Sequence, residues 1–144
     1  MYGEADLAFG PMRLWVLCRQ WPEAGDAGDA DWLVAHARAE APGAVVEVEG
    51  PWLRGADLAS FLDQLAALRA GDRDAAELDS TDPGLRLVVT RAGRGFDLTV
   101  DITPEHLTQR HRFEREGDAS DLPRIAGAVR RLLERFPVGG DRGA

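Results

Sequence analysis

Two neighbouring segments in the second half of the chain place apolar side chains at every second position. They are residues 85–90, with Leu85, Leu87 and Val89, and residues 96–102, which continue the pattern from Phe96. A two-residue period is typical of strands that bury one face. The glycine-containing segment 92–95 has the length of a hairpin connection, which predicts that the two strands pair antiparallel.

Other segments show weaker strand patterns. Residues 107–116 alternate less regularly, and we predict a third strand there. In the first half, we expect strands over residues 12–20, 32–39 and 45–49, with a turn at 41–44, and a short strand over 75–79. The loop 21–31 is rich in Gly and Asp, and residues 50–55 are expected to break the sheet. Residues 80–84 have the composition of a turn.

Two segments repeat apolar residues at three- and four-residue spacing, which is typical of a buried helix face. The first covers residues 56–70, with Asp57 in its first turn and Gly71 as its stop. The second covers residues 122–136, where Ser120 or Asp118 is expected to cap the helix and Pro123 is tolerated in the first turn.

These elements predict an α+β fold with a single twisted antiparallel sheet of about six or seven strands and two helices packed on one face. We expect one domain over residues 1–144, with residues 1–11 and 138–144 as loosely ordered tails. A length of 144 residues is sufficient for a core without disulfide support.

The charge of the chain narrows the classes of partner. The formal net charge is −8, and all 17 basic residues are arginines. An acidic surface repels nucleic acid and anionic membranes and attracts cationic proteins. We therefore expect a basic protein partner, with simple solubility as the alternative role of the charge.

The single cysteine and the first residues of the chain indicate the cellular compartment. Cys18 has no partner for an internal disulfide, which indicates a cytoplasmic protein, and its place in an alternating segment predicts burial. Residues 1–11 lack the pattern of a signal peptide, and no run reaches the roughly 20 apolar residues of a membrane span.

No pattern in the chain indicates catalysis, a metal site or a cofactor. There is no cysteine pair, no His-Glu-x-x-His helix, no nucleophile elbow and no glycine-rich phosphate loop. We expect Asp97 and Asp101 to pair across strands with Arg86, Arg110 or Arg112. An enzyme is the weaker alternative, and a cluster of His111, Arg110 and Asp101 in a cleft would favour it.

The four tryptophans are expected to anchor the core. Two of them, Trp21 and Trp32, flank the acidic loop 21–31. An exposed tryptophan beside acidic groups is the type of residue that dominates binding to a basic partner.

Several segments together resemble the WapI family of bacterial immunity proteins. They are residues 29–33, 58–68, 77–87, 96–102 and 121–137, which together span most of the chain. The resemblance implies an intracellular protein that binds and neutralises the C-terminal toxin domain of a wall-associated polymorphic toxin, many of which attack RNA. It supplies no catalytic residues, because such proteins act by steric and electrostatic occlusion.

From the acidic loop and the neighbouring strand we predict the partner-binding residues. They are Asp26, Asp29, Asp31, Trp32, Glu47 and Glu49, which would contact basic residues of the toxin. We predict no direct contact with nucleic acid or membrane, and the oligomeric state is left open. The alternative function is a non-catalytic module that binds a small ligand on an open face of a curved sheet, or another interaction module.

Overall fold

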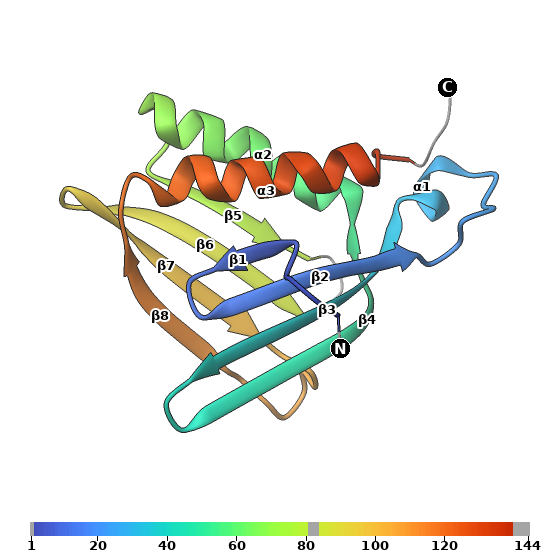
Figure 1. Ribbon diagram of the computed structural model, residues 1–144, viewed down its shortest axis with the longest axis horizontal. Helices are drawn as coiled ribbons and strands as arrows, with labels where there is room; N and C mark the ends of the chain where they lie inside the picture. The colour runs from blue at the N-terminus through green and yellow to red at the C-terminus, as the bar shows by residue number, and fades with distance from the viewer. Residues whose placement is uncertain (1, 81–83, 140–144) are drawn as a thin grey trace.

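The computed structural model describes residues 2–80 and 84–139. Within them the chain forms eight strands and three helices (Figure 1). In chain order these are β1 (Leu7–Phe9), β2 (Met12–Arg19), α1 (Ala27–Ala30), β3 (Trp32–Ala41), β4 (Ala44–Arg54), α2 (Gly55–Ala70), β5 (Ala75–Asp79), β6 (Leu85–Ala92), β7 (Gly95–Ile102), β8 (Arg112–Gly117) and α3 (Asp121–Arg135).

The strands form two antiparallel sheets rather than one. The first sheet has the order β1-β2-β3-β4 and the second has the order β5-β6-β7-β8, so within each sheet every strand pairs with its neighbours in sequence. The α+β class is confirmed, whereas the single sheet of six or seven strands is wrong. Each sheet has one apolar face, and the inner faces of both sheets belong to one continuous core.

The helices close the core along one side of the two sheets. Figure 1 shows α2 and α3 side by side above the strands, and α2 packs along β5 while α3 contacts β1. Phe61 of α2 meets Phe9 of β1 with ring centroids 6.3 Å apart, and both side chains are fully buried. The two helices therefore bridge the sheets, instead of covering one face of a single sheet.

The segment 50–55 continues the sheet where a break was expected. Strand β4 runs to Arg54, with a register shift opposite Leu33 and Ala35 of β3. Pro51 is tolerated because it lies in this register shift, between Gly50 and Leu53, on a strand at the edge of its sheet. Trp52 is 5% exposed and anchors the core, as predicted for the tryptophans.

Three further sequence predictions need correction. Cys18 is exposed rather than buried, because a register shift between Val16 and Cys18 interrupts the alternation of β2. Leu7 and Phe9 lie in β1 and in the core, within the segment expected to be a loose tail. The strand predicted over 107–116 begins only at Arg112, and the residues before it form a turn and an irregular segment.

The remaining predictions concern the two long helices, their ends, the turn 80–84 and the C-terminal tail. Both long helices are confirmed, and α2 ends at Gly71 with a left-handed φ of 85°. Ser120 occupies the position before α3 without a side-chain cap bond, while the Asp121 carboxylate accepts a hydrogen bond from the Asp118 N–H. Residues 81–83 of the predicted turn and 140–144 of the predicted tail lie outside the described residues. No helix in the described ranges is long and apolar enough to cross a membrane.

Candidate functional site

The acidic loop predicted to bind the partner contains the short helix α1. Asp26 caps this helix, since its carboxylate accepts hydrogen bonds from Gly28 N at 2.6 Å and Asp29 N at 3.2 Å. Asp26 and Asp29 are exposed, and Trp21 at the loop start is 46% exposed. Trp21 is therefore not a core anchor, and it presents an aromatic surface beside these carboxylates.

Asp31 and Trp32, at the end of the same loop, have partners within the chain. Asp31 is only 6% exposed, and its two carboxylate oxygens accept hydrogen bonds from Ala56 N at 2.9 Å and Gly139 N at 3.0 Å. It thereby binds the first turn of α2 and the segment after α3. Trp32 is half-buried, with the Arg54 guanidinium 5.6 Å from its ring centroid.

Glu47 and Glu49 lie on the outer face of the first sheet, around His36 of β3. His36 Nδ1 lies 3.1 Å from Glu49 Oε1, and Nε2 lies 3.5 Å from Glu47 Oε2. Arg38 donates to Glu47 at 2.6 Å. The Tyr2 hydroxyl donates to Glu49, and this hydrogen bond is the main cause of a raised Tyr2 pKa.

The six residues predicted from sequence do not form one cluster. Glu49 is paired with His36 and Glu47 with Arg38, which are four and six residues along β3 from Trp32. At about 3.3 Å per residue, these positions lie roughly 13 and 20 Å from the loop end of the strand. The structure therefore places the loop residues and the two glutamates in separate regions of the same sheet.

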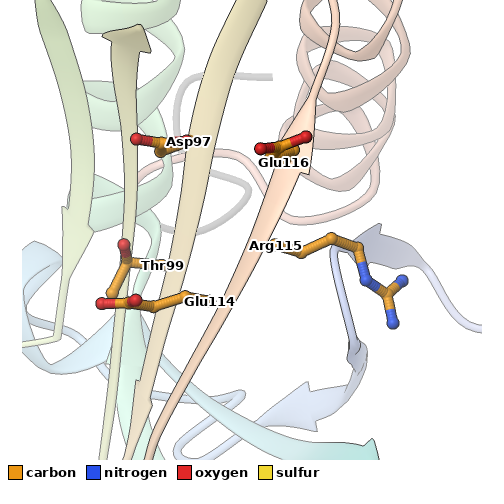
Figure 2. A pocket seen from close by; sticks show the side chains of 5 residues that line it. All are labelled: Asp97, Thr99, Glu114, Arg115 and Glu116. Carbon is orange, nitrogen blue, oxygen red and sulfur yellow. The ribbon is translucent and has the colours of Figure 1, made fainter.

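A second acidic surface, on the outer face of β7 and β8, was not predicted. Asp97 is directly opposite Glu116, and Thr99 is opposite Glu114. Figure 2 shows these four side chains on one face of the strands, while Arg115 points away from them. They line a hollow of about 310 Å³ together with Arg115. In the described residues, Asp97 and Glu116 have neither an ion pair nor a side-chain hydrogen bond.

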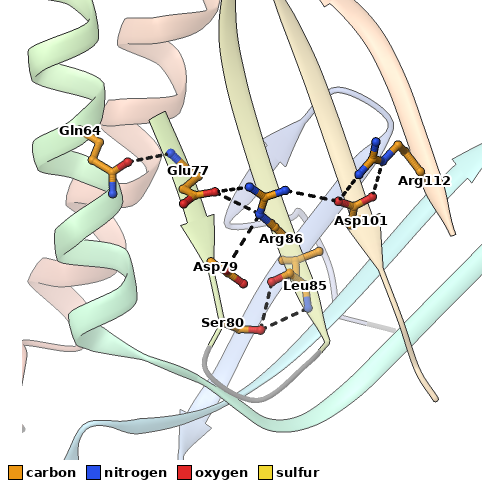
Figure 3. Close-up of polar contacts among 8 residues, drawn as sticks. All are labelled: Gln64, Glu77, Asp79, Ser80, Leu85, Arg86, Asp101 and Arg112. Carbon is orange, nitrogen blue, oxygen red and sulfur yellow. Dashed lines mark hydrogen bonds and ion pairs between the residues drawn. The ribbon is translucent and has the colours of Figure 1, made fainter. Parts of the chain in front are cut away.

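The next cross-strand pair on this face is neutralised, as the sequence predicted for Asp101. Arg112 donates to Asp101 at 2.8 and 3.2 Å, and Arg86 lies 3.9 Å from Asp101 (Figure 3). The hydrogen bond with Asp101 is the main cause of a raised Arg112 pKa. Arg86 also donates to Glu77 at 2.6 Å. Arg110 takes no part in these pairs, and Asp97 faces an acid instead of an arginine.

The signal for this surface is present in the sequence, but only the register completes it. Glu114 and Glu116 alternate with the half-buried Phe113, as Asp97 and Thr99 alternate with the buried Leu98. The alternation puts each set on the outer face of its own strand. Whether the two pairs of side chains lie close together depends on the pairing of β7 with β8. The irregular sequence pattern before Arg112 did not allow this pairing to be predicted.

The described residues assemble neither a metal-binding cluster nor the histidine cluster that would have favoured an enzyme. Over residues 2–80 and 84–139, no three His, Cys, Asp or Glu side chains are grouped to hold a metal ion. His111 interacts with Gln109 at 3.1 Å and not with Asp101, so the cluster that would have favoured an enzyme is not assembled. The main features of the surface are exposed carboxylates and one exposed tryptophan.

Comparisons with known proteins add a family. A model of the immunity protein WapI-like family matches residues 6–137. No curated protein matches the chain significantly. A chain of the solved CdiA-CT/CdiI toxin and immunity complex from Enterobacter cloacae is similar at 11% identity and a TM-score of 0.46, covering 86% of this chain and 99% of that chain. That similarity is too low to carry an argument about a partner. Because the family match extends over most of the chain, the protein belongs to the WapI-like immunity protein family.

Proposed function

We propose that this protein is a cytoplasmic immunity protein that binds the C-terminal toxin domain of a wall-associated polymorphic toxin and blocks its activity. The observation that carries the proposal is the family match over residues 6–137. The protein acts as a binding partner and not as an enzyme, and it needs no cofactor. Neutralisation then results from occlusion of the toxin's functional surface.

The charge distribution supports a basic toxin domain. The chain has a net charge of −8, and Asp97 and Glu116 face each other across β7 and β8. Like charges directly opposite each other destabilise a sheet, so this arrangement lowers the stability of the free protein. A cationic partner would relieve the repulsion and associate faster because of long-range attraction. Domains that act on RNA carry such a charge, which suits the class of toxin implied by the resemblance.

The acidic loop remains our sequence-based prediction for one contact. Its exposed members, Asp26 and Asp29, are available to a basic partner, and Trp21 beside them offers an apolar anchor. Asp31 and Trp32 have the internal contacts described above, so we assign them a supporting role. Glu47 and Glu49 are exposed, but each already has a partner in the chain.

Co-expression tests the function. The candidate toxin domain is sought among the genes beside that of this chain and is expressed with or without the protein, and growth, complex formation and stoichiometry are measured. We expect a stable complex and restored growth. Growth arrest that persists in the presence of the folded protein, without any complex, would refute the proposed function.

A charge-matched pair of variants tests the loop. Replacing Asp26 and Asp29 by asparagine should slow association and reduce its dependence on salt. The control replaces Asp63 and Asp72, which are exposed on α2 and after it, and changes the net charge equally. Equal slowing by both double variants would show that net charge matters and that the loop is not a contact.

A further inference from the structure

The two sheets have four edge strands, and the helices close two of them. The edge strands are β1 and β4 in the first sheet and β5 and β8 in the second. Arg124 of α3 donates to the outward carbonyl of Ala8 in β1 at 2.7 Å. Gln64 of α2 accepts a hydrogen bond from Glu77 N of β5 at 3.0 Å. Side chains from the helices therefore satisfy backbone groups that these edges would otherwise present.

The other two edges differ from each other. Strand β4 contains Pro51, which has no N–H to offer, and Tyr2 bonds to the Glu49 side chain at its outer face. Among the described strands, β8 pairs with β7 alone, and it contains no proline. Among the described residues, none bonds to the outer edge of β8, and Figure 1 shows this strand at the margin of the molecule.

The register identifies the backbone groups that are free on β8. Ile102 N donates to His111 O at 3.0 Å, so residues 102 and 111 form a hydrogen-bonded pair. Hydrogen-bonded and non-hydrogen-bonded pairs alternate along an antiparallel ladder. Residues 113, 115 and 117 therefore bond to β7, whereas the N–H and C=O groups of Arg112, Glu114 and Glu116 point outward.

We propose that β8 is a docking edge to which the toxin domain adds a β-strand bearing basic side chains. The inference rests on the proposed function and specifies how the partner binds. Strand addition uses main-chain hydrogen bonds for affinity and alternate side chains for specificity. The outer-face neighbours of an added strand are Glu114 and Glu116, with Asp97 behind them (Figure 2). These carboxylates complement Lys or Arg at every second position of the incoming strand.

The same charges disfavour a second copy of this chain as the occupant. A symmetric antiparallel pairing of two β8 strands centred on Glu114 would place this residue opposite its own copy. Like charges in that position are destabilising. In that register Arg112 would face Glu116 of the copy, but the net charge of −8 on each chain opposes self-association, so a basic strand from another protein is the better fit.

Residue-resolved hydrogen exchange tests the inference without any substitution. The probe is the co-encoded toxin domain used in the growth assay. In the free protein, the amides of Glu114 and Glu116 should exchange rapidly, whereas those of Phe113 and Arg115 are protected by β7. In the complex, protection should extend to residues 114 and 116. Unchanged exchange at these two amides in a stable complex would overturn the inference while leaving the proposed function in place.

A pair of variants at one position separates backbone from charge. E114A removes the carboxylate and keeps the outward N–H, while E114P removes both. Proline is tolerated here because the N–H of residue 114 takes no part in the ladder with β7. We expect E114P to bind the toxin domain about tenfold more weakly than E114A, since an added strand loses a hydrogen bond and meets the proline ring.

The outcomes distinguish the two levels of the hypothesis. Equal affinities of the two folded variants would overturn strand addition at this edge. If E114A and E114P both lose binding and the amide of residue 116 is not protected from exchange in the wild-type complex, the toxin contacts the acidic face alone. That result would also overturn strand addition. A concentration-dependent dimer of the free protein with protected residues 114 and 116 would identify a second copy as the occupant. A wild-type chain that neither binds the toxin nor restores growth would refute the proposed function itself.

Discussion

The substitution D31A tests whether this aspartate supports the fold or binds the partner. Its carboxylate accepts hydrogen bonds from Ala56 N and Gly139 N at 2.9 and 3.0 Å, and the residue is 6% exposed. Hydrogen bonds to a charged group contribute about 1.5–3 kcal/mol each, and loss of a helix-capping side chain costs about 0.5–2 kcal/mol. Water can replace part of the loss near the Gly139 amide. We therefore expect the free energy of unfolding to fall by about 2–4 kcal/mol.

Urea and thermal denaturation measure this change. For a chain of this size, each kcal/mol lowers the melting temperature by roughly 2–4 °C, so the expected decrease is about 4–16 °C. The matched control is D29A, an exposed residue of the same loop, for which we expect a change below about 0.5 kcal/mol. A D31A protein as stable as the wild type but deficient in toxin binding would refute the structural assignment and restore Asp31 to the partner site.

Three further predictions concern the sheet surface, the start of α3 and the core. E116R should raise the free energy of unfolding in urea by about 0.5–1 kcal/mol, because an arginine opposite Asp97 replaces a like-charge pair; a less stable variant would contradict this. The hydrogen bond from the Asp118 amide, followed by Arg124, lowers the pKa of Asp121 below its ordinary 3.8. Asp121 therefore stabilises the native state above that value, and this contribution is lost as the pH falls through the native pKa. D121N should remove that part of the acid dependence in unfolding measured between pH 2 and pH 6, and an unchanged pH profile would exclude the effect. F61A should lower the free energy of unfolding by about 3–5 kcal/mol, since Phe61 is fully buried against Phe9; a loss below 1 kcal/mol would contradict the packing.

Most individual elements were predictable because their signals are local. The apolar spacing of residues 56–70 and 122–136 predicted both long helices, and the alternation around residues 92–95 predicted the hairpin of β6 and β7. Predictions failed where a neighbour overrides the local pattern. A register shift in β2 exposes Cys18, and the edge position of β4 lets the strand continue through Pro51.

The candidate surfaces likewise combine features that the local sequence predicts with features that only long-range contacts decide. Composition singled out the loop 21–31, and the structure exposes Trp21, Asp26 and Asp29 there. It could not reveal that Asp31 is turned inward, because the amides that the carboxylate binds come from residues 56 and 139. Such long-range hydrogen bonds leave no periodic signal in the sequence.

The sequence by itself determined which face is apolar in the two long helices and in the regularly alternating strands, and hence the α+β class, because side-chain direction follows from the backbone period alone. The tertiary structure decided that eight strands divide into two sheets joined by α2 and α3, since the apolar faces of both sheets are buried together in one core. It also decided that Asp97 lies opposite Glu116 and that β8 is an edge strand of the second sheet. Both features depend on which strands meet and in what register, and that choice is made by contacts between residues far apart in the chain.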